Sequence, residues 1–142
     1  MTYPNPAIRL LIAEDNHDAR EVLGLIIAKK LPDAAIFFAE NGRKGVELFK
    51  EHAVDIVVTD INMPDMDGIQ MAREIKALKS DTKFILLSGH CDHKYLKEFN
   101  SIGIQYCISK PLEFNKFFSA VDKCIAEINM KRQSDALCCH LH

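Results

Sequence analysis

Short apolar runs alternate along this chain with longer segments whose apolar residues recur every three or four positions. The runs have the length and composition of strands that are covered on both faces. They occupy residues 8–13, 35–39, 56–60, 84–87 and 105–109. This pattern predicts five buried strands, each followed by a helix.

The helical segments differ in how strongly their spacing is marked. In the first, four apolar residues fall on one helical face: Val22, Leu23, Ile26 and Ile27. The helix predicted over 92–100 is more polar, which indicates weak anchoring to the core. The helix that begins at Leu112 has the clearest apolar stripe, and it extends to Ile128.

The two ends of the chain lack these patterns. Pro4 and Pro6 oppose regular structure, so residues 1–7 are predicted to be a short lead-in. Residues 129–142 lose the helical spacing and are predicted to form a poorly ordered tail. The remaining segment, 8–128, is predicted to be one domain.

Strict alternation of strands and helices indicates a parallel sheet between two layers of helices, because right-handed crossovers place a helix over the sheet after each strand. We therefore predict an α/β fold of the flavodoxin-like, doubly wound type, with five strands and five helices. The strand order expected for this class is 2-1-3-4-5.

Net charge, the length of the apolar runs and the number of cysteines argue against several classes of function. The 142 residues carry a net charge of -2, which gives no reason to expect direct binding of nucleic acid or membranes. No apolar run approaches the roughly 20 residues of a membrane span, so a cytoplasmic location is expected. The five cysteines are odd in number and lack Cys-x-x-Cys spacing, which argues against a disulfide framework or a zinc ribbon. Most of them are interpreted as small buried residues.

Polar residues stand where the predicted strands end, and parallel strands bring these ends to one edge of the sheet. They are Glu14, Asp15, Asp60, Ser88 and Lys110. Clustered carboxylates without His or Cys favour a hard cation such as Mg²⁺. A lysine and a hydroxyl add donors for an anion. Together these groups predict a phosphoryl site in which Asp60 is the nucleophile.

The same residues resemble those of the receiver domain of two-component response regulators, over about residues 8–128. The markers are Glu14-Asp15, Asp60 within Asp-x-x-Met-Pro-x-x-Asp-Gly, Ser88-Gly89 and Lys110-Pro111. The resemblance implies that Asp60 accepts a phosphoryl group from a phosphohistidine on a sensor histidine kinase or a histidine phosphotransfer protein. The protein would then be a signalling switch more than an enzyme.

Further roles follow from this resemblance. Mg²⁺ would be held by Glu14, Asp15, Asp60 and the backbone carbonyl of Asn62. Ser88 and Lys110 would contact the phosphoryl group. Asn62 and His90 would tune its lifetime, or else be exposed loop residues without such a role. The face formed by the fourth helix, fifth strand and fifth helix would bind effectors or a second copy of the chain, and the bond before Pro111 is expected to be cis.

One position departs from the family pattern. The switch aromatic usually stands three residues before the lysine, where this chain has Cys107, and Tyr106 comes one residue earlier. A one-residue offset in a strand reverses the face to which a side chain points. We expect Cys107 to occupy the switch position; a bulge that brings Tyr106 there is the other option.

Two alternatives belong to other function classes. A pseudo-receiver would signal through protein contacts without phosphorylation. A flavodoxin-like or nucleotide-binding enzyme is disfavoured by the absence of Gly-x-Gly-x-x-Gly and Walker motifs. A terminal cluster, Cys138, Cys139, His140 and His142, has soft-metal ligand types, but a disordered terminus is the preferred interpretation.

Overall fold

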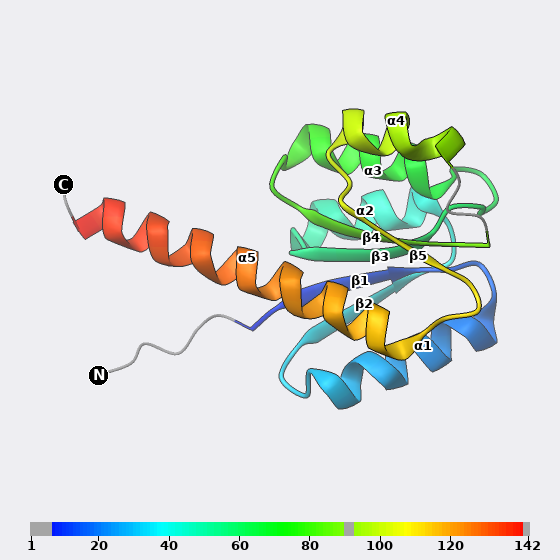
Figure 1. Cartoon of the computed structure of the whole chain (residues 1–142), viewed down its shortest axis with the longest axis horizontal. Coiled ribbons are helices and arrows are strands. Elements are labelled where there is room, and N and C mark those ends of the chain that lie inside the picture. Colours follow the sequence, from blue (N-terminus) through cyan, green and yellow to red (C-terminus); the bar gives the residue numbers. More distant parts are fainter. Residues whose placement is uncertain (1–6, 90–92, 141–142) are drawn as a thin grey trace.

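The computed structural model describes residues 7–89 and 93–140, which form a five-stranded parallel sheet covered by helices on both faces (Figure 1). Strands and helices alternate throughout. The strands are β1 (Arg9–Ala13), β2 (Ala35–Ala39), β3 (Ile56–Asp60), β4 (Lys83–Ser88) and β5 (Tyr106–Ser109). The helices are α1 (His17–Lys30), α2 (Gly42–His52), α3 (Gly68–Leu78), α4 (His93–Ile102) and α5 (Phe114–His140).

The strand order is β2-β1-β3-β4-β5, and every neighbouring pair is parallel. This confirms the predicted fold class and order. The central strand β3 is buried from Ile56 to Thr59 and becomes half-buried only at Asp60. The phosphoacceptor candidate therefore lies at the end of a strand whose other residues are buried.

Two apolar cores lie on opposite faces of the sheet. One contains side chains of α2, α3 and α4, among them Phe49, Ile75 and Phe99. The other contains side chains of α1 and α5, among them Ile27 and Phe117. Figure 1 shows the same division, with α2, α3 and α4 on one side of the sheet and α1 and α5 on the other.

Three helices that follow the carboxyl edge begin at capping side chains. The side chains of Asn16, Asn41 and Asp67 accept backbone N–H bonds at the starts of α1, α2 and α3. Such caps satisfy amide groups that have no partner within the helix. The caps fix where each loop of this edge ends and where each helix starts.

The end of the chain differs from expectation. Disorder was predicted from residue 129, but α5 continues as one helix to His140. Lys131 pairs with Asp81 at 2.6 Å, and Arg132 pairs with Asp55 at 3.3 Å. These ion pairs hold the segment that lacks an apolar stripe, and the helix then projects beyond the sheet (Figure 1).

Among the described residues, no helix is both long enough and apolar enough to span a membrane.

Candidate functional site

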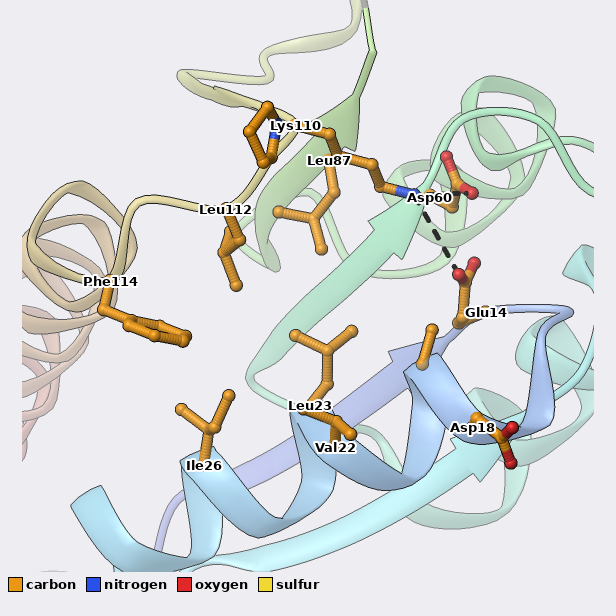
Figure 2. Close-up of a pocket in the computed structure, with 12 residues that line it drawn as sticks. Glu14, Asp18, Val22, Leu23, Ile26, Asp60, Leu87, Lys110, Leu112 and Phe114 are labelled. Carbon is orange, nitrogen blue, oxygen red and sulfur yellow. Dashed lines mark hydrogen bonds and ion pairs between the residues drawn. The ribbon is translucent and has the colours of Figure 1, made fainter.

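The carboxyl edge of the sheet brings Glu14, Asp60 and Lys110 together. Asp60 ends β3, while Lys110 follows β5, and the amide of Lys110 donates to the carbonyl of Ser88 at 2.7 Å. The Lys110 ammonium Nζ lies 3.1 Å from Asp60 Oδ2 and 3.9 Å from Glu14 Oε1. Figure 2 shows these side chains meeting at one end of a cavity. The convergence predicted from the strand ends is therefore present.

Three carboxylates of this edge are close enough to share a cation. One oxygen each from Glu14, Asp15 and Asp60 lies within 4.8 Å of the others. Glu14 Oε2 is buried and has no hydrogen-bond partner among the described residues. An orphaned buried oxygen beside two further carboxylates suits a hard ion with oxygen ligands. The residues thus fit Mg²⁺.

The protonation of Glu14 reflects this crowding. Burial, followed by hydrogen bonding to and repulsion from Asp60, raises the pKa of Glu14 from 4.5 to about 7, although Lys110 opposes the shift. Desolvation and like charges both disfavour the ionised carboxyl group. Without a cation, the folded protein therefore holds a proton on Glu14 more tightly than the unfolded chain does.

A pH dependence of stability follows from this raised pKa. Well below pH 4.5, Glu14 is protonated in both the folded protein and the unfolded chain, and the stabilising contribution of the raised pKa is fully present. As pH rises, the unfolded chain ionises first, so this contribution is lost until the folded protein also ionises, at about pH 7. We expect the free energy of unfolding to fall by about 2–3 kcal/mol across this window in chelator. Glu14→Gln should remove that decrease, as measured by urea unfolding at pH about 5 and about 8.

Glu47→Gln is the matched control, since Glu47 is an exposed carboxylate on α2. This variant should keep the wild-type pH dependence. An equal slope in the Glu14→Gln protein and the wild type would contradict the assignment to Glu14.

The loop between β3 and α3 packs tightly under Asp60. The Gly68 amide donates to the Ile61 carbonyl at 2.8 Å, and a Cβ at Gly68 would overlap the carbonyl oxygen of Asp60. The Thr59 hydroxyl Oγ1 donates to the carbonyl oxygen of Asp60 at 2.8 Å. Glycine is therefore required where α3 begins, because any side chain would displace the backbone of Asp60.

Two other predicted site residues, Asn62 and Ser88, also lie at the carboxyl edge of the sheet. Asn62 is exposed in the loop after β3, and Ser88 is buried at the end of β4. The predicted roles of the Asn62 carbonyl and the Ser88 hydroxyl stay predictions. His90 lies outside the described residues. The peptide bond between Lys110 and Pro111 is cis, as expected.

Tyr106 and Cys107 point to opposite faces of the sheet. Tyr106 packs with the core of α1 and α5, and its hydroxyl donates to Glu127 of α5 at 2.9 Å. Cys107 packs with the core of α2, α3 and α4. Cys107 is also disulfide-bonded, so it does not fit the interpretation made for most of the cysteines. Cys124, a buried free thiol, does fit it.

Tyr106→Phe should loosen the attachment of α5 to β5. The variant loses the hydrogen bond to Glu127, while Glu127 keeps its ion pair with Lys83 at 2.6 Å. We expect the free energy of unfolding to fall by about 1 kcal/mol in urea titrations. The pKa of Tyr106, which burial and Glu127 raise to about 12, ensures that the hydroxyl remains a donor. An unchanged unfolding midpoint would contradict this contribution.

An apolar cavity of about 510 Å³, here called the α1 groove, adjoins the acidic edge (Figure 2). It runs between α1 and the segment that follows β5. The lining residues are Glu14, Asp18, Ala19, Val22, Leu23, Ile26, Asp60, Leu87, Lys110, Pro111, Leu112 and Phe114. Asp60 thus belongs both to the charged cluster and to the wall of an apolar cavity.

Sequence patterning did not predict this groove. Val22 shares a helical face with Leu23 and Ile27, yet 53% of its surface is exposed whereas the other two are buried. Phe114 is 52% exposed on the opposite wall. The available signal was the width of the apolar face of α1, which exceeds what the sheet covers.

Comparisons with known proteins agree with this geometry. A family model described as the response regulator receiver domain matches residues 10–122. The chemotaxis protein CheY of Bacillus subtilis is 32% identical over 117 residues, which cover 82% of this chain and 97% of that protein. CheY of Thermotoga maritima is 35% identical, with 81% of this chain and 95% of that protein covered. The chain spans 34% of the length of another relative, the B. subtilis regulatory protein YesN.

Solved structures show the same similarity. The N-terminal domain of an uncharacterized protein from Wolinella succinogenes superposes with a TM-score of 0.79 at 32% identity, covering 88% of this chain and 99% of that one. CheY in a CheX-CheY-BeF3-Mg complex from Borrelia burgdorferi gives a TM-score of 0.77 at 28% identity, covering 83% and 89%. The resemblance inferred from the sequence is confirmed. The chain belongs to the response regulator receiver domain family of two-component systems.

Proposed function

We propose that this receiver domain is a phosphoacceptor switch in which Asp60 takes a phosphoryl group from a phosphohistidine. The donor would be a sensor histidine kinase or a histidine phosphotransfer protein, in the cytoplasm. The observation that carries the proposal is the placement of Lys110 Nζ 3.1 Å from Asp60 Oδ2 at the edge that also holds Glu14. The BeF3 and Mg named for the B. burgdorferi CheY complex support it by analogy.

The chain's own residues divide the chemistry among them. Asp60 is the last residue of β3, and its side chain is 15% exposed. An oxygen of Asp60 would attack phosphorus while the bond from phosphorus to the histidine nitrogen breaks and the imidazole leaves with that electron pair. The ammonium of Lys110 lies close enough to Asp60 to pair with an oxygen of the phosphoryl group. When bound, Mg²⁺ would neutralise charge on the phosphoryl oxygens, with Glu14, Asp15, Asp60 and the Asn62 carbonyl as its protein ligands.

The response to phosphorylation would pass along β4 and β5. Ser88 and the Lys110 backbone are joined by a hydrogen bond, and Cys107 faces the helices of the α4 side. We propose that Ser88 moves onto the phosphoryl group and that Cys107 stands at the switch position. The face formed by α4, β5 and α5 would then change its affinity for an effector or for a second copy of the chain. Asn62 and His90 are proposed to tune the phosphate lifetime.

Direct phosphorylation tests this function. The purified chain is incubated with acetyl phosphate and Mg²⁺, and the intact mass is measured. We expect the addition of one phosphoryl group, and its absence when a chelator removes the divalent cation. An unchanged mass with Mg²⁺ and with both acetyl phosphate and a phosphohistidine donor would instead support a phosphorylation-independent pseudo-receiver.

A further inference from the structure

We propose that the α1 groove binds the acyl chain of acyl phosphates, so that donors with longer chains phosphorylate Asp60 faster than acetyl phosphate does. This inference rests on the proposed function and adds to it a preference among acyl phosphates for those with longer chains. The groove begins at the phosphoacceptor itself, because Asp60 and Lys110 line one end of it. A molecule that reacts with Asp60 therefore has apolar surface within reach.

The two ends of the groove differ in chemistry. Figure 2 shows Glu14, Asp60 and Lys110 at one end, and Val22, Leu23 and Ile26 of α1 on the side opposite Leu112 and Phe114. Asp18 is the remaining charged residue of the lining. With Mg²⁺ held by the carboxylates and with Lys110 beside them, a ligand that matches both ends would have an anionic phosphate joined to an apolar chain. An acyl phosphate has this form, and its mixed anhydride is already activated for transfer.

The dimensions also suit a small molecule. A volume of about 510 Å³ falls within the range of roughly 300–1,000 Å³ typical of small-molecule sites. The floor is formed by buried side chains, Leu23 and Leu87, whereas Val22 and Phe114 on the walls are more than half exposed. An acyl chain would cover these exposed side chains, which is favourable because apolar surface leaves water.

The transfer balances without any further reactant. An oxygen of the Asp60 carboxylate forms a bond to phosphorus, and the bond between phosphorus and the acyl oxygen breaks. The carboxylate of the fatty acid leaves with that electron pair, and Asp60 becomes an aspartyl phosphate. Donors of different chain length release carboxylates of nearly the same basicity, so differences in rate report binding of the chain.

Rates with a series of donors test the proposal. We would measure kcat/KM for phosphorylation of the full chain, in Mg²⁺, by acetyl, butyryl and hexanoyl phosphate, following the intact mass over time. Partial burial in an open groove should give about a twofold gain per methylene, hence about fourfold for butyryl over acetyl phosphate. Val22→Ser and Phe114→Ser should reduce this ratio toward one.

Leu25→Ser is the matched control, because Leu25 is on α1 and 68% exposed but does not line the groove. It should leave the ratio unchanged. Equal rates for all three donors would overturn the inference while leaving the proposed function intact, and no reaction with any donor would count against the proposed function. Chain-length independence together with slower transfer from a phosphohistidine protein in Val22→Ser would identify the groove as a protein-docking surface, and would also overturn the inference.

Discussion

Asp60→Asn should abolish phosphorylation of the chain. The amide has nearly the same shape as the carboxylate but is not a nucleophile, so no aspartyl phosphate can form. The Asp60 side chain is 15% exposed and contacts Lys110 Nζ, and the substitution keeps an oxygen acceptor for that ammonium group. The intact mass after incubation with acetyl phosphate and Mg²⁺ should therefore remain that of the unmodified protein.

Asp65→Asn provides the control for this experiment. Asp65 is an exposed residue of the same loop with a positive φ of 65°, which asparagine tolerates as well as aspartate does. This variant should be phosphorylated at the wild-type rate. Phosphorylation of the Asp60→Asn protein to the wild-type extent would show that another residue is the acceptor.

Gly68→Ala should impair both folding and phosphorylation. The added Cβ would overlap the carbonyl of Asp60, so the start of α3 or the end of β3 must shift. We expect a loss of about 2 kcal/mol in the free energy of unfolding, typical of overpacking in a tight contact. Displacement of Asp60 relative to Lys110 should also slow phosphorylation by about tenfold or more, because transfer depends on alignment.

The matched control is Gly89→Ala. Gly89 follows β4 at the same edge, and a Cβ there would meet no atom within 4 Å. Its unfolding midpoint should stay close to that of the wild type. If both alanine variants were equally stable, the close approach between Gly68 and Asp60 would not be the constraint that we infer.

The fold and the centre of the site were predictable because both depend on local patterns. Apolar runs of strand length identify the strands, and parallel strands carry their carboxyl ends to one edge. The sequence alone therefore predicted that the side chains of Glu14, Asp60 and Lys110 lie close together. The one-residue offset between Tyr106 and Cys107 similarly predicted opposite faces, as observed.

The remaining features depend on contacts between distant residues. Periodicity placed Val22 on the apolar face of α1 but could not show that the sheet leaves it 53% exposed. The disulfide at Cys107 has no signature in the spacing of the cysteines. The part of α5 just beyond Ile128 is held by Lys131 and Arg132, whose partners lie 50 and 77 residues earlier in the chain. No pattern within the helix predicts such pairs.

The length of α5 has a mechanical consequence. Its 27 residues make a rod of about 40 Å, which starts beside the Lys110-Pro111 bond and passes the ion pairs of Lys131 and Arg132 before it leaves the sheet. Rotating such a rod by about 5° at its first turn would move its far end by about 3.5 Å. A small rotation at the start of α5 would therefore produce a larger displacement at its far end.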